Sequence, residues 1–242
     1  MAPLLEDRIA VVTGASRGIG YAVARELARH GAHVIAVART EGGLTDLDDE
    51  IRAGGGTATL VPLDLTDYEG IDRLGAAIFE RWKKLDILVG NAGLLGTLSP
   101  LGHISPKDWD SVMAVNVTAN WRLIRSLDPL LRQSDAGRSL FVTSGAAVSF
   151  KAYWGGYAVS KAALEALVRT YAAEIASTSC RTNLFNPGPV RTGMRAKAMP
   201  GEDPATLTTP AEIASCFPAL VAPSCLHNGA VYDFKAKAFV DR

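Results

Sequence analysis

The sequence predicts a doubly wound α/β domain built on one parallel sheet. Short runs rich in β-branched residues alternate with longer segments of helical periodicity along the whole chain. A glycine-rich turn separates the first such run from the first helical segment. With 242 residues, 48% of them hydrophobic, the chain is long enough to bury one large core. Alternating strands and helices form right-handed βαβ units, which make the strands parallel.

The elements follow one another in a regular order. Seven strands are expected over residues 8–13, 33–37, 57–63, 85–89, 138–143, 181–185 and 230–233. The longer helices are expected over about residues 19–30, 42–53, 68–82, 109–131 and 157–175. The Pro- and Gly-rich stretch 186–210 is too long for a plain connector, so we expect a substrate lid around residues 189–209. No linker or repeat divides residues 1–242, which we interpret as a single domain.

Composition excludes several classes of function. Lys+Arg 25 balance Asp+Glu 25 without a basic run, which argues against nucleic acid or an anionic membrane as a partner. No apolar stretch is long enough to span a bilayer, and the first residues lack a basic secretory leader. Three cysteines cannot pair completely, which favours reduced thiols and a cytoplasmic location. The four histidines are scattered without ligand spacing, so no metal site is expected.

The first glycine-rich turn lies between a strand and a helix. Its glycines, Gly14, Gly18 and Gly20, have the spacing G-x-x-x-G-x-G. Glycines let the backbone approach a pyrophosphate, and the following helix N-terminus offers free N–H groups and the positive end of a dipole. The alternative is a tight turn that needs only positive φ angles.

A second group of residues has the character of a proton-transfer site. Tyr157 and Lys161 stand four residues apart at the start of a predicted helix and so share one face. Ser144 lies just past the fifth strand, at the sheet edge where α/β proteins bind ligands. A tyrosine with an ordinary pKa of about 10 needs a nearby cation to exchange protons at neutral pH, and Lys161 is placed to be that cation. The alternative is an exposed helical pair and an unrelated loop serine.

Together these motifs resemble the short-chain dehydrogenase/reductase family over essentially the whole chain. The resemblance rests on residues in the family's order and spacing: Thr13, Gly14, Gly18, Gly20, Asp64, Asn91–Gly93, Asn116, Ser144, Tyr157, Lys161, Pro187 and Gly188. It implies a Rossmann-type three-layer sandwich with a seven-stranded parallel sheet in the order 3-2-1-4-5-6-7. It also implies reversible hydride transfer between a nicotinamide cofactor and a carbonyl/alcohol substrate.

The resemblance also implies a role for each catalytic position. Tyr157 would be the general acid or base, and Lys161 would lower its pKa and hold the nicotinamide ribose. Ser144 would hydrogen-bond the substrate oxygen, and Asn116 would support a water through which Lys161 reaches solvent. Two alternatives stay open: a cofactor-binding sensor or scaffold without turnover, and a Tyr/Lys epimerase or dehydratase.

The resemblance assigns further positions to the cofactor. They are Gly14, Ser16, Arg17, Gly18, Ile19, Gly20, Arg39, Asp64, Leu65, Asn91, Ala92, Gly93, Pro187, Gly188, Val190 and Thr192, with Tyr157 and Lys161. Asp64 resembles the residue that contacts the adenine; the alternative is a helix N-cap. The family usually has two asparagines before Ala92, and this chain has Gly90 in the first position. The end of the chain departs too, reading Asp233-Phe-Lys235 where many relatives have Asp-Gly-Gly.

The end of the second strand favours NADP(H) over NAD(H). An acidic residue there usually grips the adenosine ribose and repels a 2′-phosphate, but this strand leads directly into Arg39. Arg17 offers a second guanidinium for the phosphate, and Glu41 is close enough in sequence to compete for Arg39. The alternative is that both arginines are solvated and NAD(H) fits as well.

The substrate itself is not predicted beyond a small carbonyl or alcohol. Its pocket wall is expected to include Leu94, Leu95, Trp154, Met194 and Met199, with Ser144 and Tyr157 at the reacting atoms. Arg191 and Arg195 either meet an anion or are simply solvated. A homodimer or homotetramer is expected through the helices 109–131 and 157–175, the second of which is rich in alanine.

Overall fold

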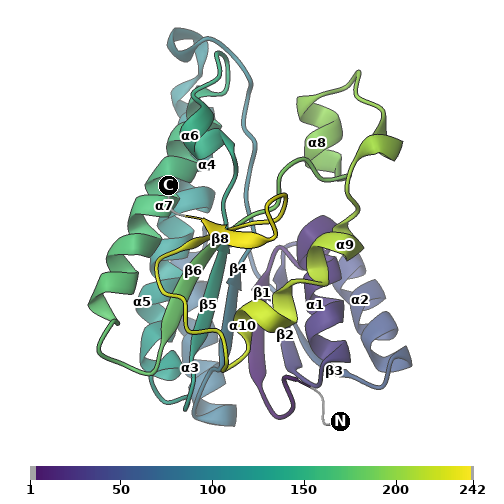
Figure 1. Cartoon of the computed structure of the whole chain (residues 1–242), viewed down its shortest axis with the longest axis vertical. Helices are drawn as coiled ribbons and strands as arrows, with labels where there is room; N and C mark the ends of the chain where they lie inside the picture. Colours follow the sequence, from purple (N-terminus) through teal and green to yellow (C-terminus); the bar gives the residue numbers. More distant parts are fainter. Residues whose placement is uncertain (1–3, 241–242) are drawn as a thin grey trace.

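One eight-stranded sheet organises the molecule, which we describe from a computed structural model of residues 4–240 (Figure 1). The strands run in the order β3-β2-β1-β4-β5-β6-β7-β8. Their bounds are β1 Ile9–Thr13, β2 His33–Ala38, β3 Thr57–Pro62, β4 Ile87–Gly90, β5 Arg138–Val142, β6 Arg181–Asn186, β7 Val231–Asp233 and β8 Ala238–Val240. The predicted order of the seven parallel strands is confirmed. Residues 1–3 and 241–242 of the predicted domain lie outside the described residues.

The strand count needs a correction, because β8 was not predicted. It runs antiparallel to β7, with Tyr232 opposite Phe239. Phe239 also stacks on His227, with ring centroids 3.8 Å apart. The divergent C-terminal segment that begins at Asp233 therefore turns back and extends the sheet by one short strand.

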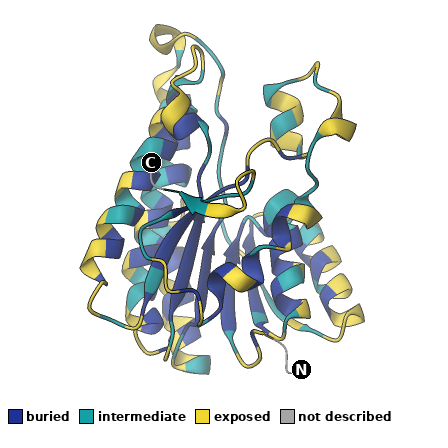
Figure 2. Ribbon diagram, in the orientation of Figure 1, coloured by how far each residue is buried: buried dark blue, intermediate teal, exposed yellow. Residues whose placement is uncertain are grey.

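Helices cover both faces of the sheet (Figures 1 and 2). One face packs against α1 Gly18–Arg29, α2 Glu41–Ala53, α9 Pro210–Ala214 and α10 Phe217–Val221. The other packs against α3 Tyr68–Trp82, α5 Ala119–Leu131 and α7 Gly155–Glu174. Along β1, Ala10 and Val12 enter the first core and Ile9 and Val11 the second, as alternation in a strand buried on both faces requires.

The helix predicted over residues 109–131 is not a regular α-helix. It comprises α4 Pro106–Met113, a π-helical segment η2 Ala114–Thr118 and α5. The Ala119 N–H donates to the Ala114 carbonyl, five residues back, which is the π pattern. Such an inserted residue rotates the side chains that follow it, and here the segment contains Asn116.

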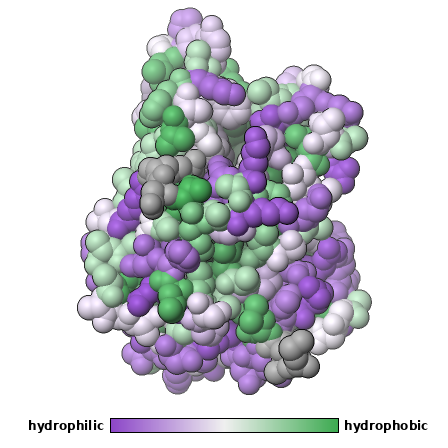
Figure 3. Space-filling model, in the orientation of Figure 1, coloured by the Kyte–Doolittle hydropathy of each residue, from purple (hydrophilic) through white to green (hydrophobic). Residues whose placement is uncertain are grey.

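Two parts of the chain project from the carboxyl edge of the sheet. One carries α6 Ala146–Ser149 and the N-terminal end of α4, and the other carries α8 Gly193–Ala198 and the short turn η3 Pro204–Thr206 (Figure 1). In the space-filling view a notch separates the two parts at their tips (Figure 3).

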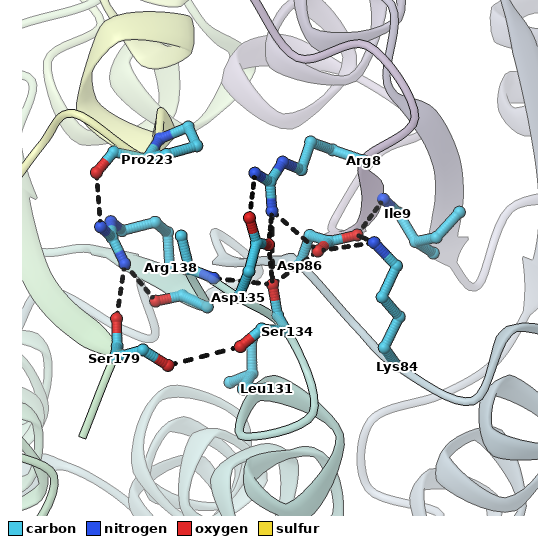
Figure 4. Close-up of polar contacts among 12 residues, drawn as sticks. Arg8, Ile9, Lys84, Asp86, Leu131, Ser134, Asp135, Arg138, Ser179 and Pro223 are labelled. Atoms are coloured by element: carbon cyan, nitrogen blue, oxygen red, sulfur yellow. Dashed lines mark hydrogen bonds and ion pairs between the residues drawn. The ribbon is translucent and has the colours of Figure 1, made fainter.

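The opposite edge of the sheet is closed by a cluster of paired charges (Figure 4). The fully buried Asp86 lies 3.1 Å from the Arg8 guanidinium and 3.0 Å from the Lys84 ammonium. It also accepts hydrogen bonds from the Ile9 N–H and the Ser134 hydroxyl. Every oxygen of this buried carboxylate is therefore satisfied.

Some classes of feature are absent from residues 4–240. Within them, no helix has both the length and the apolar character needed to cross a membrane. The same residues contain no group of three His, Cys, Asp or Glu side chains placed to hold a metal ion. All three cysteines, Cys180, Cys216 and Cys225, are free.

Candidate active site

A cavity of about 740 Å³ opens at the carboxyl edge of the sheet, between the two projecting parts. It is lined by nearly all of the residues predicted for the site: Gly14, Ser16, Arg17, Gly18, Ile19, Arg39, Asp64, Leu65, Asn91, Ala92, Gly93, Leu95, Ser144, Trp154, Tyr157, Lys161, Pro187, Gly188, Val190, Thr192 and Met194. Gly20 and Asn116 do not line it but contact residues that do. The prediction that Met199 belongs to the pocket wall is wrong, because Met199 lines a separate hollow beside α8. Residues from both halves of the chain therefore meet in one place.

The glycine turn leaves the start of α1 open to this cavity. Gly14 and Gly18 have φ angles of 68° and 61°, which a side chain would strain. Gly20 has no room for a side chain, because a Cβ there would lie 2.4 Å from the Gly14 carbonyl oxygen. The N-cap residue Arg17 makes no side-chain capping bond, so the first N–H groups of α1 remain available to an anion. These features fit a dinucleotide pyrophosphate.

A hydrogen-bond network braces the turn against β4. The Thr13 hydroxyl donates to the Val89 carbonyl and accepts from the Asn91 and Ala92 N–H groups. The Asn91 amide nitrogen lies 2.9 Å from the Thr13 carbonyl oxygen. One asparagine thus makes this brace, although Gly90 stands where the family usually has another.

Gly90 is required by its neighbours. A Cβ at this position would lie 2.3 Å from the Phe141 ring and 2.7 Å from the Asn120 side-chain oxygen. The space that a side chain at position 90 would need is therefore filled by a core phenylalanine and by an asparagine of α5.

The part of the cavity next to the ends of β2 and β3 is lined by two arginines and an aspartate. Arg17 and Arg39 both line it, and the partner of Arg39 is Asp64, with 3.6 Å between the guanidinium and the carboxylate. The expected competition from Glu41 is not observed. Burial would raise the pKa of Asp64, but hydrogen bonds from Thr66 and the Arg39 guanidinium outweigh it and lower that pKa.

The N-cap alternative for Asp64 is wrong. Asp67 caps α3, accepting a hydrogen bond from the Gly70 N–H at 2.9 Å. Asp64 instead accepts from the Thr66 N–H and hydroxyl, at 2.9 and 2.8 Å.

Ser144, Tyr157 and Lys161 meet at the other end of the cavity. The Ser144 hydroxyl accepts a hydrogen bond from the Ala146 N–H at 3.1 Å. Burial raises the pKa of the Tyr157 phenol, and the interaction with the Ser144 side chain opposes that shift. Lys161 is only 4% exposed, and its Nζ donates to the Val142 carbonyl at 2.8 Å. Burial lowers the pKa of Lys161 to about 8, against the opposing field of Glu165.

Asn116 is completely buried and fixes the segment that faces Lys161. Its side chain accepts from the Leu94 N–H at 2.8 Å and donates to the Leu94 carbonyl and the Ser160 hydroxyl, each at 2.9 Å. Asn120 donates in turn to the Asn116 carbonyl at 2.9 Å. The π-helical segment is therefore held from both sides.

The outer part of the cavity has apolar walls and contains Arg195, which is paired with Glu202. Trp154 packs edge-on to Tyr157, with ring centroids 6.1 Å apart, and Leu95 and Met194 also line the space. Arg195 is neither free for an anion nor merely solvated, because it forms a two-pronged ion pair with Glu202 at 2.5 and 2.6 Å. Arg191 is exposed and is absent from this cavity's lining.

Comparison with known proteins identifies the family. Residues 8–203 match the family model described as short chain dehydrogenase. The chain belongs to the short-chain dehydrogenase family. As a member of it, this protein is an NAD(P)-dependent oxidoreductase.

Individual relatives agree with this assignment. This short-chain dehydrogenase is 41% identical to the uncharacterised oxidoreductase YciK of Escherichia coli K12, over 87% of this chain and 84% of that protein. A short-chain dehydrogenase structure from Shigella flexneri 2a, complexed with NADP, has a TM-score of 0.92 and 39% identity, covering 96% of this chain and 99% of the other. An Escherichia coli CFT073 structure complexed with NADPH has a TM-score of 0.90 and 39% identity, covering 96% and 98%.

Several residues of the dehydrogenase's site were not predicted. Thr40, Asp108 and Lys197 line the cavity, and Glu165 is bonded to Thr143, which lines it. Asn120 and Ser160 hold Asn116 behind the wall. Thr40 directly follows Arg39 at the end of β2, so its position was a usable signal. The other residues belong to helices whose sequence does not distinguish them from ordinary polar positions.

Proposed function

We propose that this dehydrogenase interconverts a small-molecule carbonyl and the corresponding alcohol with NADP(H), using Ser144, Tyr157, Lys161 and Asn116. The observation that carries the proposal is that Ser144, Tyr157 and the buried Lys161, one helical turn from Tyr157, line the same cavity that the glycine turn also enters. The bound nicotinamide would supply or accept the hydride.

Each catalytic side chain has a task that its surroundings favour. In the reducing direction Tyr157 would donate its phenolic proton to the carbonyl oxygen, and its raised pKa keeps that proton in place beforehand. Ser144 would donate a hydrogen bond to the same oxygen as negative charge develops on it. The Lys161 ammonium, 5.8 Å from the Tyr157 ring centroid, would stabilise the phenolate that remains. Asn116 would hold the Leu94 segment beside Lys161 and support the water that links this lysine to solvent.

The cofactor proposal rests on the cavity's adenosine end. Arg17 and Arg39 would bind the 2′-phosphate. Residues that follow the carboxyl ends of β1, β4 and β6 line the same cavity and would bind other parts of the cofactor. Two similar structures, both at 39% identity, are complexed with NADP or NADPH. Arg39 would exchange its long contact with Asp64 for the phosphate, which binds a guanidinium more strongly than one exposed carboxylate does.

We also propose an oligomer, a lid and a cytoplasmic location. Trp121 on α5 and Val159 on α7 are 44% and 42% exposed, and a homodimer or homotetramer through α4, α5 and α7 would cover them. Residues 189–209, which contain α8, would close over the substrate. Three free cysteines are consistent with a reducing compartment. Light scattering showing a 25.6 kDa particle at micromolar concentration would contradict the oligomer.

The function is tested with the purified protein, NADPH and a panel of aldehydes and ketones. Consumption of NADPH is followed by the absorbance of the reduced nicotinamide, and the alcohol product is identified. We expect turnover of at least one carbonyl by the wild type. Cofactor binding without turnover across the panel and its alcohol counterparts would instead support a sensor or scaffold.

A further inference from the structure

Three consecutive residues at the end of β5 each contact one residue of α7. Val142 accepts a hydrogen bond from the Lys161 ammonium at 2.8 Å. Thr143 donates its hydroxyl to the Glu165 carboxylate, also at 2.8 Å. The Ser144 side chain interacts with the Tyr157 phenol and opposes the rise in its pKa. The contacts on α7 therefore fall at intervals of four residues, on one face of the helix, and Glu165 is the member for which the mechanism above has no task.

Glu165 is unusually well enclosed for an acidic residue. It is 5% exposed, and its second carboxylate oxygen lies 3.5 Å from the guanidinium of Arg169, one turn further along α7. The Arg169 side chain is 40% exposed. Burying a carboxylate is costly, so a buried carboxylate that is bonded to Thr143 of the cavity lining points to a role for the charge.

The groups around Lys161 indicate that the charge of Glu165 acts on this lysine. On α7 Lys161 lies one turn from Tyr157 on one side and one turn from Glu165 on the other, and its ammonium is bonded to the Val142 carbonyl of β5. From η2 the Asn116 amide lies close by, because a Cβ at Gly93 would be 3.3 Å from the Asn116 side-chain oxygen and 3.6 Å from the Lys161 Nζ. Of these, only the carboxylate carries a charge at neutral pH. Burial lowers the pKa of this lysine and Glu165 opposes the shift, which leaves the pKa at about 8. A small change in the field at this lysine therefore alters its charge in the physiological range.

We propose that Glu165 is a positioning residue for the reaction: held by the Thr143 hydroxyl against the end of β5, its carboxylate keeps Lys161 in the protonated form. This inference deepens the proposed function, because it names what maintains the cation that Tyr157 depends on. Arg169 moderates the effect by drawing the carboxylate toward the surface.

The first test measures the protonation of Lys161 directly. An NMR pH titration of the lysine ¹³Cε resonances in the cofactor-free protein, assigned with Lys161→Met, gives the midpoint for this side chain. Glu165→Gln keeps an acceptor for Thr143 and removes the charge, so the midpoint is expected to fall by about one pH unit. At a pH near 8, the wild-type midpoint, the protonated fraction would then drop from about one half to about one tenth.

Three further variants test the direction of the shift in the Lys161 midpoint and provide a control. Arg169→Gln removes the competing cation at a partly exposed site, so the Lys161 midpoint is expected to rise. Thr143→Val frees the carboxylate to swing toward Arg169, so the midpoint should fall by less than in Glu165→Gln. Ser126→Ala is the matched control: it removes a 3.2 Å helix-to-backbone hydrogen bond from α5 to the Ile71 carbonyl, and should leave the midpoint unchanged.

An unchanged or higher Lys161 midpoint in Glu165→Gln overturns the proposal. If Glu165→Gln does not fold, a lower Lys161 midpoint in Arg169→Gln overturns it instead. NADPH fluorescence titrations provide the functional reading: affinity should weaken with rising pH about one unit earlier in Glu165→Gln than in the wild type. If no carbonyl is turned over, the proposed function fails while the NMR titration still decides the role of Glu165.

Discussion

The two edges of the sheet treat buried charge in opposite ways. At the amino edge, the buried Asp86 carboxylate is in contact with Arg8 and Lys84 and accepts two further hydrogen bonds (Figure 4). At the carboxyl edge, the Lys161 ammonium is also buried, but it donates a hydrogen bond to the neutral Val142 carbonyl, and Glu165 acts on it from one helical turn away.

This difference shows how the same fold separates stability from chemistry. A fully paired charge has its desolvation offset by its partners and holds segments together. A buried charge with weaker compensation has a shifted pKa, which costs stability and places its titration near neutral pH. Loss of a charged group at the amino edge should therefore lower the free energy of unfolding, and loss of one at the carboxyl edge should lower activity.

The largest expected effect lies at the carboxyl edge. Tyr157→Phe should lower kcat by about 10²–10⁴-fold, because the general acid is lost. Cofactor affinity and melting temperature should stay close to wild type, since the ring and its packing on Trp154 remain. Steady-state kinetics measure kcat, and NADPH titrations measure the cofactor affinity. Retention of more than about a tenth of the activity would contradict the role of Tyr157 as the general acid.

The next effect tests the amino edge. Asp86→Ala leaves the Arg8 and Lys84 charges without their shared partner and should cost about 3–5 kcal/mol of unfolding free energy. Asp135→Ala is the matched control, because Asp135 contacts the same Arg8 with a side chain that is 72% exposed, and should cost less than about 1 kcal/mol. Urea denaturation measures both. Equal losses in the two variants would show that burial is not what separates them.

A smaller effect is expected at the adenosine end of the cavity. Arg39→Asp should lower the ratio of kcat/KM for NADPH to that for NADH by about 10–100-fold, because a charge-assisted contact to the phosphate is replaced by repulsion. Arg195→Ala is a suitable control, since Arg195 is occupied by Glu202. A wild type that uses NADH as well as NADPH, or an unmoved ratio in the variant, would rule out the phosphate contact.

The smallest effect is the pH dependence of the wild type. The pKa of Lys161 is lowered to about 8, so its cation is present below that pH and is lost as the pH rises through it. Rates that require the cation should fall toward a limit of about ten-fold per pH unit above the midpoint. For stability the sign is reversed: the unfolded chain binds the extra proton between about pH 8 and the ordinary value of 10.5, so unfolding free energy should increase with pH over that window. Lys161→Met should remove both trends.

Local sequence patterns were sufficient for the frame of the site. Alternating strands and helices predicted a parallel sheet, and the family resemblance implied its strand order. The positions just past strand ends predicted which side chains meet at the carboxyl edge. The spacing of Tyr157 and Lys161 predicted their common helical face, because residues four apart are neighbours on any α-helix. The absence of an acidic residue at the end of β2 could also be read from the sequence, because it concerns only a few adjacent residues.

The pairing of distant side chains depended on packing. Arg39 pairs with Asp64 and not with the nearer Glu41, Arg195 is held by Glu202, and Glu165 is buried against Thr143. The π-helical turn at Asn116 and the strand β8 also have no local signature. Periodicity and turn chemistry report on a window of a few residues, whereas the partner of a charged group is decided by which segments the assembled sheet brings within a few ångströms of it, and by how much water they exclude.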